Sequence, residues 1–176
     1  MCATNWQLTK STMSFGGFHG GTSQSSEIDE STPWVAAGDG NLALLQESIA
    51  KLGLAPNASD SNGFTFLHAA CGYVREDVIR WLLSLNKDST TIDVNAKDAD
   101  GDTPLHHCDD VNSAKLLIEG GADFRIQNDE GLTALEVKEE ELKEGDGDEE
   151  DSEDEDREKM KELVEYLKSI QVDKME

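Results

Sequence analysis

Histidine and cysteine side chains that could bind a metal or take part in catalysis lie in two short stretches of the sequence. His68 and Cys71 occupy the first stretch, and His106, His107 and Cys108 the second. Imidazole nitrogen and thiolate sulfur are common zinc ligands, and a cysteine beside a histidine can form a nucleophile pair. Nothing else in the sequence supplies an orienting acid or a pocket, so a Cys–His nucleophile is disfavoured.

A second pattern of possible ligands is formed by Asp98, Asp100 and Asp102, which match the first, third and fifth positions of a calcium-binding loop. The sixth position, however, is Thr103 instead of glycine, and the twelfth is Asp109 instead of glutamate. We interpret these aspartates as part of a turn. Glycine-rich phosphate loops, nucleophile elbows and zinc-protease helix motifs are also lacking, so we expect no enzymatic activity and no cofactor.

All these residues belong to a unit that recurs along the chain. Residues 60–70 align with 98–108 and with 128–136, and residues 32–37 form a truncated copy. Each full unit has a glycine that suits a tight turn with positive φ, at Gly63, Gly101 and Gly131. Each glycine is followed two positions later by a threonine able to cap a helix, at Thr65, Thr103 and Thr133.

A short apolar helix is expected after each threonine, and a second helix after that. The second helices carry apolar residues at helical spacing, at Leu42, Leu45 and Ile49, at Val78, Ile79, Leu82 and Leu83, and at Ala114, Leu117 and Ile118. A single unit cannot bury both apolar faces, so the units must stack.

In this pattern the sequence resembles the ankyrin-repeat family. Asp-Ala-Asp-Gly-Asp-Thr-Pro-Leu-His at 98–106 is close to the opening of that repeat, and Ile-Glu-Gly-Gly-Ala-Asp at 118–123 is close to its ending. The resemblance implies an all-α solenoid of about four stacked helix-turn-helix repeats with projecting β-turns. It also implies that His68 and His106 are structural residues bonded to backbone between repeats, and that Cys108 packs as a small buried residue. A metal site is therefore not expected.

Two departures from the family pattern concern the C-terminal half. Residues 109–113 alone separate Cys108 from Ala114, which puts the geometry of the third repeat's second helix in question. The second helix of the fourth repeat is delayed until after an acidic run, where Leu163, Tyr166, Leu167 and Ile170 share one helical face.

The predicted organisation follows from these patterns. We expect a disordered leader at 1–31, the repeat domain at 32–138, an acidic disordered insertion at 139–156, a capping helix of the last repeat at 157–172 and a disordered tail at 173–176. The alternative for residues 157–172 is an independent, solvent-facing helix.

The charge balance restricts the classes of partner. The chain has 38 acidic and 15 basic residues, a net charge of −23, which disfavours nucleic-acid binding. Thirteen of the acids and a single lysine lie within residues 139–156. The apolar runs are too short for a membrane span, and three sparse cysteines are typical of a reducing compartment. We expect a monomer in the cytoplasm, the nucleus or both.

The resemblance implies that a partner protein binds through the projecting turns and the concave face of the first helices. By position, the partner-binding residues are Ser61, Asn62, Phe64, Ala99, Asp100, Asp102, Asp129, Glu130 and Leu132. Their acidic character suits a partner with a basic surface. In the alternative reading the acidic segment itself binds, as a chaperone or shield for basic proteins, or else is only a solvated spacer. Ser152, followed by acidic residues, resembles an acidophilic kinase site.

Overall fold

The structure, a computed structural model, describes residues 28–88, 92–144 and 155–173. Within these residues the regular structure is helical, and two isolated antiparallel bridges, Ser59 with Thr65 and Gln127 with Thr133, close the first and last turns. The helices are α2 (Thr32–Asp39), α3 (Leu42–Leu52), α4 (Phe66–Gly72), α5 (Glu76–Ser84), α6 (Val111–Glu119), α7 (Ala134–Glu144) and α8 (Glu155–Asp173), with a 3-10 helix at Leu85–Asp88.

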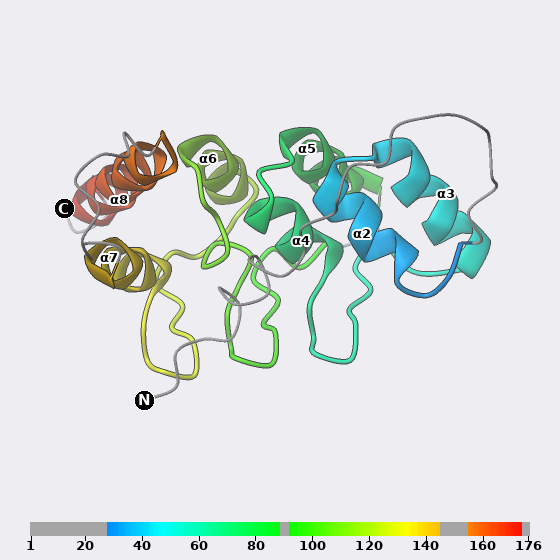
Figure 1. The fold of residues 1–176 in the computed structure, drawn as a ribbon, viewed down its shortest axis with the longest axis horizontal. Coiled ribbons are helices and arrows are strands. Elements are labelled where there is room, and N and C mark those ends of the chain that lie inside the picture. Colours follow the sequence, from blue (N-terminus) through cyan, green and yellow to red (C-terminus); the bar gives the residue numbers. More distant parts are fainter. Residues whose placement is uncertain (1–27, 89–91, 145–154, 174–176) are drawn as a thin grey trace.

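The helices form two rows, and three long turns project beyond one of them (Figure 1). Helices α3, α5, α6 and α8 make the outer row, whereas α2, α4 and α7 make the inner row beside the turns. Each inner helix packs on its successor, and α2 also packs on α4, α5 on α6 and α6 on α8. Repeat 1 is thus α2 and α3, repeat 2 is α4 and α5, repeat 3 contains α6, and repeat 4 contains α7, on which α8 packs. The predicted all-α solenoid is confirmed.

One continuous apolar core runs along the stack between the two rows. Side chains from every repeat contribute to it, among them Leu45, Phe66, Leu67, Ile79, Leu82, Leu105, Leu117, Leu135, Leu163 and Leu167. Burial of such side chains is the main driving force for stacking, and no single repeat could achieve it.

Repeat 3 has no first helix, because turns replace it over residues 104–107. The expectation that an apolar helix follows each threonine is therefore wrong here. The second helix, whose geometry was in question, is regular, and the Asp110 carboxylate accepts from the backbone N–H groups of Asn112 and Ser113 at its start. From the threonine to the second helix the chain advances eleven positions in repeat 2 (65 to 76) but eight in repeat 3 (103 to 111). The missing three positions remove almost one helical turn.

The acidic segment 139–156 is helical at both ends, contrary to the expected disorder. Helix α7 continues to Glu144, and α8 starts at Glu155. Ion pairs account for part of the ordered α7 extension: Glu139 lies 2.7 Å from Lys168, and Glu141 lies 2.9 Å from Lys138. Residues 145–154, with Ser152, lie outside the described residues.

The apolar face predicted for residues 157–172 packs on the preceding helices. Leu163 and Leu167 of α8 are buried, and Tyr166 and Ile170 are half-buried against the same core. Helix α8 contacts both α6 and α7. None of the helices in the described part of the chain is both long and apolar enough to cross a membrane.

Candidate functional site

Each of the three projecting turns is closed by the side chain at its first position. In repeat 2, the Asp60 carboxylate accepts hydrogen bonds from the backbone N–H groups of Asn62 (2.8 Å) and Phe64 (2.9 Å). Asp98 makes the same bonds to Asp100 and Asp102, and Asn128 makes them to Glu130 and Leu132. The predicted positive φ is present at Gly63 (75°), Gly101 (77°) and Gly131 (81°).

The turns of repeats 3 and 4 are also bonded to each other. The backbone N–H of Asp129 donates to the carbonyl oxygen of Asp100 at 3.1 Å. The Asn128 amide donates to the Asp102 carboxylate at 2.9 Å. Internal closure and cross-bonding together fix the turn backbones before any partner arrives.

Histidines connect the helical layer of one repeat to the turn of the next. The Nδ1 atom of His68 accepts from the backbone N–H of Thr65 at 3.1 Å, and its Nε2 atom lies 3.1 Å from the carbonyl oxygen of Asp102. A carbonyl only accepts, so His68 is neutral with its proton on Nε2. His106 repeats the arrangement with Thr103 (3.1 Å) and the carbonyl of Leu132 (3.2 Å). The structural role expected for both histidines is confirmed.

Burial sets the protonation of these histidines. It disfavours the imidazolium and, with the neighbouring His107, lowers the pKa of His68 to about 4. Burial likewise lowers the pKa of His106. In repeat 4 the same position is Glu136, which accepts from the Thr133 backbone N–H at 2.8 Å and keeps only the local cap.

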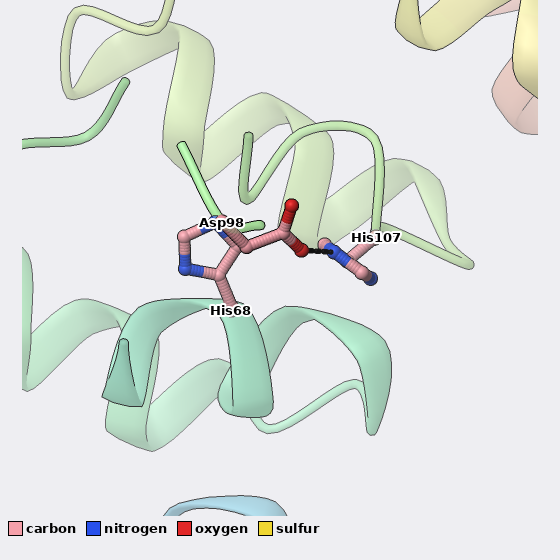
Figure 2. Close-up of side chains that lie close together, drawn as sticks. All are labelled: His68, Asp98 and His107. Carbon is pink, nitrogen blue, oxygen red and sulfur yellow. Dashed lines mark hydrogen bonds and ion pairs between the residues drawn. The ribbon is translucent and has the colours of Figure 1, made fainter. Parts of the chain in front are cut away.

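His68, Asp98 and His107 form a compact cluster beneath the turns (Figure 2). One ligand atom from each lies within 4.8 Å of the others. The Asp98 carboxylate receives a 2.8 Å hydrogen bond from Nε2 of His107. Burial alone would raise the pKa of Asp98. The hydrogen bond from His107 and the electrostatic interaction with it outweigh burial, so the pKa of Asp98 lies below its usual value. Because both nitrogens of His68 are already bonded, a metal could bind only by breaking contacts of the fold.

The pairing of Asp98 with His107 was not predicted: Asp98 was expected to belong to a turn, and no partner was expected for its second carboxylate oxygen. A signal was present, since Asp60, Asp98 and Asn128 hold the same place in successive units. That place marks a turn-closing residue. The second oxygen of Asp98 is then free to accept from another side chain.

Phe64 lies on a turn and also makes contacts inside the fold. Its ring stacks on His68, with centroids 5.2 Å apart, and meets His107 edge-on at 5.3 Å. Its carbonyl oxygen accepts a 2.8 Å bond from the indole N–H of Trp34. Phe64 therefore links repeat 1 to the cluster beneath the turns.

The nine predicted partner-binding residues lie on the three successive turns, but differ in exposure. Six are exposed at the tips: Ser61, Asn62, Ala99, Asp100, Asp129 and Glu130. We call these six the turn row. Phe64, Asp102 and Leu132 are half-buried and engaged in the contacts described above.

The two cysteines that lie near the histidines in the sequence, Cys71 and Cys108, are enclosed in the core. Cys71 and Cys108 are fully buried. Burial and the nearby Cys108 thiol raise the pKa of Cys71. A buried thiol with a raised pKa is a poor nucleophile.

Comparison with known proteins agrees with this geometry. Residues 33–128 match the family model of ankyrin repeats in three copies, so the chain belongs to the ankyrin-repeat family. It is similar to an ankyrin repeat-containing protein of Schizosaccharomyces pombe, with 36% identity over 107 residues, 60% of this chain and 49% of that protein.

Two further relatives match shorter stretches. The NF-kappa-B inhibitor delta of Mus musculus is 37% identical over 75 residues, 43% of this chain and 22% of that protein. The transient receptor potential cation channel subfamily A member 1 homolog of Caenorhabditis elegans is 42% identical over 71 residues, 40% of this chain and 6% of that protein. The chain thus spans about half or less of these relatives. Ankyrin repeats generally act as non-catalytic modules that mediate interactions between proteins.

Proposed function

We propose that this chain is a non-catalytic adaptor or assembly factor that binds a partner protein across the turn row and the adjoining concave face. The observation that carries the proposal is the fixed backbone of the turns. Ordering loops on binding usually costs free energy, and here the side-chain closures and the Asp129–Asp100 bond have already met that cost. The name of the mouse relative, NF-kappa-B inhibitor delta, describes that protein as an inhibitor of NF-kappa-B.

The charge of the turn row indicates the kind of partner. Ser61, Asn62 and Ala99 are neutral, whereas Asp100, Asp129 and Glu130 are acidic and exposed. Negative charge thus accumulates toward repeat 4. A protein with a basic surface facing repeats 3 and 4 would be complementary, and complementarity mainly adds association rate and specificity.

Affinity for a partner protein tests the proposal. The immobilised full chain is used to isolate a partner, which is then purified and titrated against a variant combining Asp100→Asn, Asp129→Asn and Glu130→Gln. We expect at least tenfold weaker binding, about 1.4 kcal/mol. The matched control combines Glu47→Gln, Glu119→Gln and Glu165→Gln, which removes the same charge from exposed positions on outer helices.

The control should bind the partner within twofold of the unmodified chain. Equal losses in both variants would mean that overall charge, not the turn row, holds the partner.

The second candidate function is an acidic shield for basic proteins. It is favoured by the seven acidic residues among the ten at 145–154. If the chain acts as an acidic shield, deleting residues 145–154 should abolish binding. On the turn-row proposal, the deletion should reduce association mainly at low salt, because exposed charges are screened beyond about 8 Å at physiological ionic strength.

A further inference from the structure

A hollow lies beside the shortened connection of repeat 3, where Asp109 and Asp110 lead into α6. It has a volume of about 710 Å³, within the range of ligand-binding sites. Its lining includes Val74 between α4 and α5, Glu76 at the start of α5, Asp110 and Val111 at the start of α6, and Met160 and Glu162 of α8. We call this hollow the repeat-3 notch.

The notch is a consequence of chain length. In repeat 2, α4 and its connection to α5 occupy the stretch between the capping threonine and the second helix. The same stretch of repeat 3 is three positions shorter, so it fills less space. The short stretch is held in place by Lys138 of α7, whose side chain is 1% exposed and bonds Asp109 at 3.1 Å and Glu141 at 2.9 Å. The wall of the notch is therefore anchored to the next repeat.

Val74 places an apolar side chain at the notch in an unfavourable conformation. Its φ is 56°, in the left-handed region that a β-branched residue rarely adopts. The corresponding residue of repeat 1, two positions before the second helix, is Gly40 with φ 75°. Val74 and the adjacent Tyr73 are each 41% exposed, which is unusual for large apolar side chains here. Local stability alone would favour glycine at this position.

The charge around this apolar surface is negative. Five acidic residues line the notch against two lysines, Lys115 and Lys159. Of these acids, Glu162 makes no ion pair within the described residues. An acidic ligand would be repelled, whereas lysine or arginine side chains would be attracted.

We propose that the repeat-3 notch binds a basic segment of a partner protein, with apolar side chains against Val74, Val111 and Met160 and cationic ones toward Glu76 and Glu162. Apolar contact would supply affinity that salt does not screen, and the acids would select basic sequences. Val74, which lines the notch, follows the end of α4 at Gly72, whereas the projecting turn of repeat 2 precedes the start of α4 at Phe66. This second surface is therefore separate from the turn row and goes beyond the function proposed above.

A synthetic peptide tests the notch on the full chain. The probe is fluorescein-labelled Arg-Val-Lys-Leu-Arg-Lys-Val-Arg, titrated by fluorescence anisotropy at physiological ionic strength. We expect saturable binding, and no binding of a peptide with glutamine in place of every lysine and arginine. The double variant Glu76→Gln with Glu162→Gln should bind at least tenfold more weakly.

The matched control removes two charges from exposed positions of α8 that do not line the notch, Glu158→Gln with Glu165→Gln. This control should change binding less than twofold. Equal losses in the two double variants would overturn the proposal, because the peptide would then respond only to net charge.

Val74→Gly separates binding from folding. It relieves the left-handed strain, so the thermal midpoint should rise, while loss of the side chain should weaken peptide binding severalfold. Unchanged binding would overturn the apolar part of the proposal. The variant with Asp100→Asn, Asp129→Asn and Glu130→Gln should bind the peptide normally. Loss in that variant would place the peptide on the turn row and refute the notch without refuting the proposed function.

Discussion

Nε2 of His68 in repeat 2 donates a 3.1 Å hydrogen bond to the backbone carbonyl oxygen of Asp102 in repeat 3. Nδ1 of the same ring accepts from the backbone N–H of Thr65, so the ring can make both bonds only while it is neutral. Protonation would put a hydrogen on Nδ1 against the Thr65 donor. The contact between repeats is therefore linked to pH.

Acid should destabilise the fold in two steps. The pKa of His68 is about 4 in the folded chain and 6.5 in the unfolded chain, so the unfolded chain binds the proton first. The contribution of His68 to the free energy of unfolding therefore has its full value above pH 6.5. It falls by about 3 kcal/mol as the pH drops to 4. Asp98, whose folded pKa lies below 3.8, adds a further loss at still lower pH.

Urea unfolding across this pH range, with imidazole titration by NMR, provides the measurement. A His68→Gln variant should be less stable at pH 7 but should lose less stability between pH 6.5 and 4. A folded-state midpoint near 6.5 for His68 would contradict the expectation.

The turns could be predicted from the sequence because their chemistry is local. Gly63, Gly101 and Gly131 identify backbone that needs positive φ, and Thr65 with His68 identifies a helix start. The spacing of apolar residues likewise predicts the second helices.

Features that depend on distant contacts could not be predicted. The shortness of repeat 3 is visible in the sequence, but not which helix is lost. In the structure, His106 fixes the stretch after Thr103 through its bond to Leu132, and α6 keeps its helix by burying Leu116 and Leu117. The hydrogen bond to the Phe64 carbonyl oxygen likewise comes from Trp34, thirty positions away.

Replacing Gly101 with alanine should be more harmful than replacing Gly131. Both have positive φ, at 77° and 81°, so each substitution should cost about 1 kcal/mol from backbone strain. A Cβ at Gly101 would also lie 2.7 Å from the backbone nitrogen of Asp129, whereas nothing lies within 4 Å at Gly131. We expect Gly101→Ala to cost at least about 1 kcal/mol more in chemical unfolding. Equal costs would show that the two turns are not in contact.

Cys71 and Cys108 should resist alkylation in the folded chain. Both are fully buried, and burial raises the pKa of Cys71, so little thiolate is available. In a Cys2→Ser background, iodoacetamide labelling followed by mass spectrometry should be at least about a hundredfold slower than for an added Ala50→Cys, which is exposed. Comparable rates would mean that the core between repeats 2 and 3 opens readily.

The proposal that α8 caps the last repeat predicts a large effect of Leu167→Asp. Leu167 is 2% exposed in a helix that packs on α6 and α7, so the substitution would place a carboxylate in the core. We expect a loss of about 3 kcal/mol or more in the free energy of unfolding. The control is Ser169→Asp, which puts the same charge on the exposed face of α8 and should cost less than about 0.5 kcal/mol. A melting temperature that is equal in the two variants would mean that α8 is an independent helix, and that the repeat stack is stable without it.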